Sequence, residues 1–347
     1  MYKRILVPLD GSARAERSIP VAAHIARATD GTVVLVRIAT LPFTYSPYLG
    51  SATYADEVIE ADLSEVATYL NALANSEPLA GIKTITKAIF GSAATEILST
   101  ANSYNIDLIV MTSQGNTGLK RWMLGSVALK IARYSAMPVL VLHEKGPLPV
   151  GPRLDTRPLR ALVPLDGSTL ARAAIEPAAQ LVAAIAAPGE GSIHLLRVVK
   201  PPTTAELRAV SEHGSIESLE ENKLHRAKTY LKSIIDQLHE STFAHLNFAF
   251  TWSVAVAQDV AHAIIQMAEN GEDAEGAGVF GRCDLIAIAT HGRGGLQHWI
   301  MGSITERVLG ATKLPILIVR PESAELKLAS SSEDTNEARI LEKSNAF

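Results

Sequence analysis

The residues of this sequence best suited to binding chemistry are two aspartates and two glycine-rich segments that end in Gly-Ser. They are Asp10, Gly115, Gly125 and Ser126 in the first half of the chain and Asp166, Gly292, Gly302 and Ser303 in the second. Glycine permits positive φ and close approach of the backbone to a ligand. A Gly-Ser pair that begins a helix exposes unpaired N–H groups, which favour an anion. The pattern therefore predicts a cradle for phosphate together with a carboxylate.

These residues belong to an internal repeat. The hexapeptide at 7–12, Val-Pro-Leu-Asp-Gly-Ser, recurs without change at 163–168, an offset of 166 − 10 = 156. The glycine-rich segment at 115–126 matches 292–303, an offset of 302 − 125 = 177. A turn-rich insertion at 270–278 accounts for part of the difference between the two offsets. One fold is used twice.

Short apolar runs alternate with longer amphipathic stretches in the first copy, and the second copy repeats this order. The expected strands are 4–9, 32–39, 82–89, 107–112 and 138–143, and the expected helices are 14–29, 55–75, 93–104 and 126–134. Continuous Val, Ile and Leu runs indicate strands buried on both faces. Alternation of strand and helix predicts a parallel sheet with right-handed crossovers. The fold class is α/β, with two tandem doubly wound domains, each with a five-stranded parallel sheet.

The order of these elements places the candidate residues at strand ends. Asp10 and Asp166 end the first strand of each copy, and the glycine-rich segment follows the fourth strand. Ligands of open parallel sheets lie beyond the carboxyl ends of the strands, where the strand order reverses. If the first and fourth strands are neighbours, the aspartate and the glycine-rich segment face one another across one crevice.

Composition indicates four segments. They are a first domain at 1–145, a linker rich in Pro and Gly at 146–157, a second domain at 158–321 and a polar tail at 322–347, which is expected to be disordered.

Charge and cysteine content exclude several classes of protein. The net charge of −4 gives no basic field for nucleic acid or an anionic membrane. Cys283 is the one cysteine, which excludes an intrachain disulfide and a multi-cysteine metal site. No apolar window approaches the roughly 18 residues of a membrane span, and the N-terminus has no signal-peptide pattern. We therefore expect a cytoplasmic protein without a metal site of its own.

The chain resembles the universal stress protein family over 1–143 and 158–320. Members that bind ATP carry Gly, two residues, Gly, nine residues, then Gly followed by Ser or Thr. The second and third glycines correspond to Gly115 and Gly125 in the first copy and to Gly292 and Gly302 in the second. The first glycine is replaced by Thr112 and by Ala289.

The resemblance implies an adenine-nucleotide alpha-hydrolase-like fold and a nucleotide site in each copy. Asp10 and Asp166 would lie at the adenine, Ile38 and Val198 would offer backbone groups to the base, and the glycine-rich segments would hold the phosphates. The residues assigned to these sites are Pro8, Leu9, Asp10, Ile38, Thr112, Gly115, Gly125 and Ser126, and Pro164, Leu165, Asp166, Val198, Ala289, Gly292, Gly302 and Ser303. The implied ligand is ATP, with Mg²⁺ assisting.

Family members also associate through their last strands. The strands expected at 139–142 and 316–319 are apolar sheet edges, each preceded by proline. The tandem chain then resembles a covalently linked dimer whose two copies pair with each other. Dimerisation of the tandem chain itself stays open.

Three functions follow for comparison. The first is a stress-response sensor or signalling module that binds adenine nucleotide. The second is a universal stress protein that binds no nucleotide and acts through association with other proteins. The third, an enzyme that uses adenine nucleotide, lacks a His-x-Gly-His element, a Ser-Gly-Gly-x-Asp-Ser loop and a Walker-type lysine. We expect no enzyme.

The two sites are expected to differ, with the second copy holding nucleotide better. Ala289 adds one methyl group where the family has glycine, whereas Thr112 adds a branched side chain. The second segment also carries more glycines, so that more amides can converge on an anion.

Overall fold

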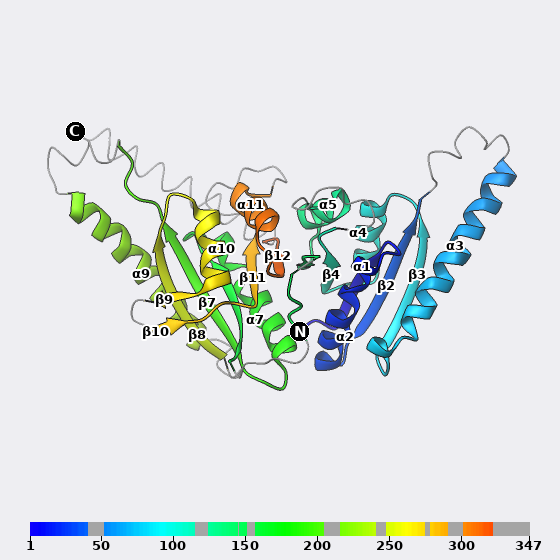
Figure 1. The fold of residues 1–347 in the computed structure, drawn as a ribbon, viewed down its shortest axis with the longest axis horizontal. Coiled ribbons are helices and arrows are strands. Elements are labelled where there is room, and N and C mark those ends of the chain that lie inside the picture. Colours follow the sequence, from blue (N-terminus) through cyan, green and yellow to red (C-terminus); the bar gives the residue numbers. More distant parts are fainter. Residues whose placement is uncertain are drawn as a thin grey trace.

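The computed structural model describes residues 1–40, 52–114, 124–144, 146–150, 157–204, 216–240, 248–274, 278–290 and 301–321. Its centre is one ten-stranded sheet with the strand order β3-β2-β1-β4-β5-β12-β11-β6-β7-β8. The first five strands in this order come from the first half of the chain and the last five from the second (Figure 1).

Each half contains the strands and helices that the apolar pattern predicts, together with a few short elements that it does not. In the first half they are β1 (Arg4–Leu9), α1 (Ala13–Glu16), α2 (Ser18–Thr29), β2 (Thr32–Ala39), α3 (Ala52–Ala74), the 3-10 turn η2 (Glu77–Leu79), β3 (Lys83–Phe90), α4 (Ala93–Ser103), β4 (Leu108–Thr112), α5 (Ser126–Tyr134) and β5 (Val139–Leu142). In the second half they are β6 (Leu159–Pro164), α6 (Thr169–Arg172), α7 (Ile175–Ala186), β7 (Gly191–Val199), α9 (Ile216–Glu240), β8 (Phe248–Val256), α10 (Val260–Asn270), β9 (Glu272–Ala274), β10 (Gly278–Phe280), β11 (Leu285–Ala289), α11 (Ser303–Ala311) and β12 (Ile316–Val319).

Within each half the strands of the ten-stranded sheet run parallel, and their order is that of a doubly wound fold. β1 pairs with β2 on one side and with β4 on the other. β6 lies in the same way between β7 and β11. The predicted fold class is therefore confirmed, and the expected neighbourhood of the first and fourth strands is present in both halves. The two five-stranded sheets are joined into one through the last strand of each half, β5 and β12.

Helices cover both faces of the sheet, and the strand residues alternate between two cores. Ile5, Val7 and Leu35 belong to the core beneath α2, α3, α7 and α9. Leu6 and Val34 belong to the core beneath α4, α5, α10 and α11. Each core contains buried residues of both halves, so the apolar layers continue across the junction.

The junction between the halves is formed by an antiparallel ladder and by helix contacts. β5 pairs with β12 through Val139–Ile318, Leu140–Leu317 and Val141–Ile316. α2 packs beside α7 near the middle of the molecule, whereas α3 and α9 lie at its two ends (Figure 1). Hydrogen bonds run from Tyr2 Oη to the Pro177 carbonyl (2.9 Å) and between His24 Nε2 and the Ile185 carbonyl (2.9 Å).

Two local predictions need correction. The helix expected at 14–29 is divided at Arg17, because Pro20 has no N–H to donate and its ring conflicts with the carbonyl of Glu16, where α1 ends. The insertion expected to be rich in turns at 270–278 also carries strand structure, because β9 pairs with β10 as a short antiparallel hairpin. Among the described residues, no helix is long and apolar enough to cross a membrane.

Candidate functional site

The carboxyl ends of β1 and β4 lie next to each other, as do those of β6 and β11. β1 is paired with β2 from Arg4 to Leu9, but its described pairs with β4 are only Ile5–Leu108 and Leu6–Ile109. The pairs of β6 with β11 likewise stop at Leu162–Ile286. Doubly wound folds hold their ligands beyond the carboxyl ends of neighbouring strands, so these unpaired strand ends are where a ligand is expected.

A tight turn carries Asp10 from β1 into α1. The Asp10 carboxylate oxygen Oδ1 accepts hydrogen bonds from the backbone N–H (3.0 Å) and the hydroxyl (2.6 Å) of Ser12. The Ser12 hydroxyl in turn accepts from the Ala15 N–H (3.2 Å) and so caps α1. Gly11 has a φ of +85°, a conformation that favours glycine.

The second half repeats this turn almost bond for bond. Asp166 Oδ1 accepts from the Ser168 N–H (2.9 Å) and hydroxyl (2.5 Å), and Gly167 has a φ of +89°. Ser168 caps α6 through the Ala171 N–H (3.2 Å). Each aspartate is therefore held in one orientation at the strand end, and each is partly exposed.

The Gly-Ser pairs begin α5 and α11 as the sequence predicts. Gly125 and Gly302 are the N-cap residues, and neither helix has a side-chain cap. The Gly125 N–H is bound by the Ser113 carbonyl and the Gly302 N–H by the Thr290 carbonyl, both at 2.8 Å. Ser126 and Ser303 are exposed in the first turn of their helices. The side chains of Ser126 and Ser303 therefore do not cap these helices. No capping side chain accepts a hydrogen bond from the N–H groups of either first turn.

Thr112 and Ala289, at the first motif position, are both buried. The Thr112 hydroxyl donates to the Gln114 carbonyl (3.1 Å), so this side chain belongs to the turn after β4. In the second half a hydroxyl from α11 closes the corresponding turn, because Thr305 donates to the Ala289 carbonyl (2.9 Å).

The other assigned residues lie at or beside the same strand ends. Ile38 and Val198 are partly buried near the ends of β2 and β7. Pro8, Leu9, Pro164 and Leu165 end or directly follow β1 and β6. Gly115 and Gly292 lie outside the described residues.

Two arginines that sequence reasoning missed lie beneath the aspartate turns. Arg37 directly precedes Ile38, and Arg197 directly precedes Val198. A Cβ atom built on Gly11 would lie 2.9 Å from Arg37 Cζ, and Arg197 Nη1 donates to the Leu165 carbonyl (3.1 Å). The signal was present in the repeat, since both arginines occupy the same position in the second strand of their copy.

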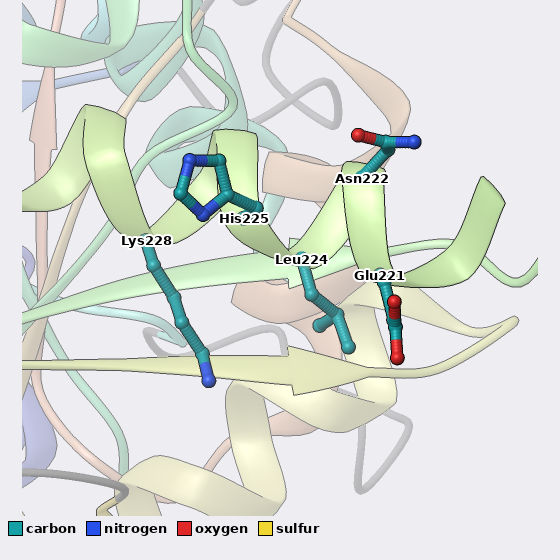
Figure 2. Close-up of a pocket in the computed structure, with 5 residues that line it drawn as sticks. All are labelled: Glu221, Asn222, Leu224, His225 and Lys228. Atoms are coloured by element: carbon teal, nitrogen blue, oxygen red, sulfur yellow. The ribbon is translucent and has the colours of Figure 1, made fainter. Parts of the chain in front are cut away.

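A hollow of about 440 Å³ lies along α9 (Figure 2). Its described lining residues are Glu221, Asn222, Leu224, His225 and Lys228. Figure 2 shows Glu221, Leu224 and Lys228 on one side of the helix and His225 on another. All five belong to one helix, so no second described element brings groups toward a ligand here. No cluster of three metal-ligating side chains occurs in the described part of the chain.

The fold and its two equivalent strand-end turns define a tandem, doubly wound α/β protein. Residues 1–143 and 159–320 each match the universal stress protein family, and the chain belongs to that family.

Individual relatives agree with this assignment. A universal stress protein of Methanocaldococcus jannaschii is 33% identical over 145 residues, which are 42% of this chain and 84% of that protein. The universal stress protein YxiE of Bacillus subtilis is 31% identical over 148 residues, 41% of this chain and all of that protein. The crystal structure of a universal stress protein from Archaeoglobus fulgidus covers 91% of this chain and 98% of its own, with a TM-score of 0.59 and 18% identity. That similarity concerns the fold.

Proposed function

We propose that this chain binds adenine nucleotide at the two strand-end crevices and acts as a stress-response module whose partners respond to the bound nucleotide. The observation that carries the proposal is the duplication of one geometry. In each half an oriented aspartate follows the first strand, and a glycine-capped helix follows the neighbouring fourth strand.

The parts of a nucleotide have matching partners in this arrangement. Asp10 and Asp166 supply acceptors for a base or ribose, and backbone groups at Ile38 and Val198 lie beside them in the sheet. The first turns of α5 and α11 supply N–H groups and a helix dipole for phosphate. Affinity in the micromolar range corresponds to about −8 kcal/mol, which such a set of interactions can supply.

Binding rather than catalysis is the proposed activity. Phosphoryl transfer requires groups that stabilise charge on the transferred phosphoryl, such as a positioned lysine and a metal-binding carboxylate. The sequence supplies no such motif beside the two crevices. A universal stress protein that acts through association alone is the competing function, and it is distinguished by its lack of bound nucleotide.

The test is calorimetric titration of the purified chain with ATP, ADP and GTP, with and without Mg²⁺. We expect adenine nucleotides to bind more tightly than GTP, and Mg²⁺ to strengthen ATP binding. The control is the double variant Gly125→Val, Gly302→Val. The φ angles of Gly125 and Gly302 are ones that any residue adopts. A Cβ atom built on Gly125 would lie 3.4 Å from the nearest carbonyl oxygen, and one built on Gly302 would lie 3.2 Å from its nearest carbonyl oxygen. No heat and no thermal shift with millimolar ATP would favour the association-only function.

We also propose that the two halves stay paired in solution through β5 and β12. The ladder between them and the Arg133–Glu306 ion pair (2.7 Å) between α5 and α11 support this. A cytoplasmic location stays a prediction from the sequence, and association of two tandem chains stays open.

A further inference from the structure

Arg37 and Arg197 occupy equivalent positions but hold the two aspartate turns differently. Arg37 is the β2 partner of Leu9, the residue before Asp10. Arg197 follows Leu196, the β7 partner of Pro164, so it lies level with Leu165, the residue before Asp166. Each arginine can therefore reach the turn of its own copy from the same direction.

In the first half the arginine stacks on a tyrosine of α3. Arg37 Cζ lies 4.9 Å from the centroid of the Tyr69 ring, and the guanidinium fills the space against Gly11. The Tyr69 hydroxyl donates to Glu16 Oε1 (2.8 Å) at the end of α1. Burial and this hydrogen bond to Glu16 raise the pKa of Tyr69, so the hydroxyl remains a donor.

In the second half a different arginine covers the corresponding tyrosine of α9, since Thr-Tyr-Leu at 68–70 recurs at 229–231. Arg172, at the end of α6, places Cζ 5.1 Å from the centroid of the Tyr230 ring, and its Nε lies 3.3 Å from the Tyr230 hydroxyl. Arg197 donates from Nη1 to the Leu165 carbonyl (3.1 Å), directly before Asp166. The backbone that leads into this turn is thus tied to a side chain of the neighbouring strand.

The difference follows from one position of the repeat. Glu16 and Arg172 correspond, since 172 − 16 = 156 is the offset of the repeated hexapeptide. In the first half the Glu16 carboxylate accepts a hydrogen bond from the Tyr69 hydroxyl and leaves the face of the ring to Arg37. In the second half the Arg172 guanidinium itself covers the face of the tyrosine ring.

The exchange also changes the charge beside each aspartate. At this one position the exchange of Glu16 for Arg172 makes the second half more positive by two charges, whereas Arg14 and Arg17 of the first half correspond to Leu170 and Ala173. The exchange by itself favours an anionic ligand in the second half.

We propose that Arg37 and Arg197 are positioning residues for the aspartate turns, and that the exchange of Glu16 for Arg172 makes the two sites unequal, the second binding anionic nucleotide more tightly. This inference rests on the proposed nucleotide binding. Neither arginine is placed among the groups that touch the ligand.

The first experiment uses the chain without nucleotide and measures exchange of the Ser12 and Ser168 backbone amides by NMR. Both amides donate to the aspartates, so their protection reports the setting of each turn. Arg197→Leu is expected to increase exchange of the Ser168 amide about tenfold, the equivalent of one charge-assisted hydrogen bond, with no change at Ser12. Arg197→Lys, which keeps a cationic donor, is expected to restore most of the protection. Unchanged Ser168 exchange in Arg197→Leu would overturn the positioning role, whether or not nucleotide binds.

The second experiment measures ATP affinity one site at a time. Gly125→Val leaves the second site to report, and Gly302→Val leaves the first. In the Gly125→Val chain, Arg172→Glu is expected to weaken ATP binding about threefold to tenfold. In the Gly302→Val chain, Glu16→Arg is expected to strengthen it by a similar factor. Both effects should shrink as salt is raised to about 0.5 M, since the charges are partly exposed.

Opposite shifts in the two chains support the inference. Equal affinities of the two single-site chains, or shifts in the same direction, would overturn the inequality while leaving nucleotide binding intact. Absence of ATP binding to the unmodified chain would instead overturn the proposed function and the inequality with it, and the amide exchange would still decide the positioning role.

Discussion

At the scale of single residues, His194 is a polar group in the middle of the sheet. It is fully buried in β7, with Nδ1 2.8 Å from Thr251 Oγ1 and Nε2 2.9 Å from Ser253 Oγ on β8. A neutral imidazole donates through one nitrogen and accepts through the other, so it serves both hydroxyls. Burial, with a smaller effect of Arg160, lowers the pKa of His194 to about 3. The equivalent position in the first half is Val34.

Because His194 is buried in its neutral form, we expect the protein to lose stability in mild acid. Between pH 6.5 and about 3 the unfolded chain binds a proton at His194 and the folded chain does not, so the free energy of unfolding falls by about 1.4 kcal/mol for each pH unit lowered. His194→Val should cost about 1–3 kcal/mol at pH 7, because two buried hydroxyls lose their partner. Between pH 6.5 and pH 5, the free energy of unfolding of the His194→Val variant should fall by about 2 kcal/mol less than that of the unmodified chain. Urea unfolding at several pH values measures both effects, and parallel pH profiles would contradict the assignment.

Cys283 gives a second prediction at this scale. The thiol is buried, and burial raises its pKa to about 12. Because the thiolate is the reactive form, we expect slow modification by a thiol reagent in the native protein and rapid modification in urea. Native reactivity equal to that of the unfolded chain would show that the thiol is accessible.

At the scale of elements, the helices that follow the first and fourth strands begin in different ways. α1 and α6 are capped by Ser12 and Ser168, whereas α5 and α11 begin at Gly125 and Gly302 without a side-chain cap. A side-chain cap occupies an N–H that an anion would otherwise bind. The uncapped pair is therefore the one suited to phosphate.

The prediction at this scale compares the two uncapped helices. Gly302→Val should remove more nucleotide per chain than Gly125→Val, since the second half has Arg172 in place of Glu16 and a turn tied by Arg197. The measurement is nucleotide bound per chain at a fixed ATP concentration, with melting temperature as the control for folding. The ranking is reversed if Gly125→Val abolishes binding and Gly302→Val leaves it intact.

At the scale of the whole molecule, the central ladder makes the two halves one body. Leu140 and Leu317 face each other in β5 and β12, and both are fully buried. The helix contact of α2 with α7 and the Tyr2–Pro177 hydrogen bond add to this ladder. An apolar edge that is paired inside the chain is not available for pairing with other molecules.

This architecture predicts that the chain stays assembled after it is cut between its halves. A protease site placed within residues 151–156 should, once cleaved, leave both fragments in one peak on size-exclusion chromatography and native mass spectrometry. Leu317→Asp should separate the cleaved fragments, because a buried carboxylate in the ladder is costly without a partner. Separation of the unmodified fragments would show that the linker, and not the ladder, holds the halves together.

Much of the architecture was determined by the sequence itself, because the features concerned are local or repeated. Continuous apolar runs predict buried parallel strands, and the unchanged hexapeptide at 7–12 and 163–168 places both aspartates at the ends of first strands. The Gly-Ser pairs predict the beginnings of α5 and α11, which the structure has at Ser126 and Ser303. Pairing of the last strands was expected from their apolar edges, each preceded by proline, together with the resemblance to the family.

Tertiary structure alone decided how equivalent residues are used. Arg37 and Arg197 occupy the same place in the repeat, but one stacks on Tyr69 and the other donates to Leu165. The choice depends on Glu16 and Arg172, and Glu16 lies 53 residues before the tyrosine whose hydroxyl it binds. Periodicity and spacing predict which face of an element is buried, but a contact between distant side chains depends on how two packed elements bring those side chains together.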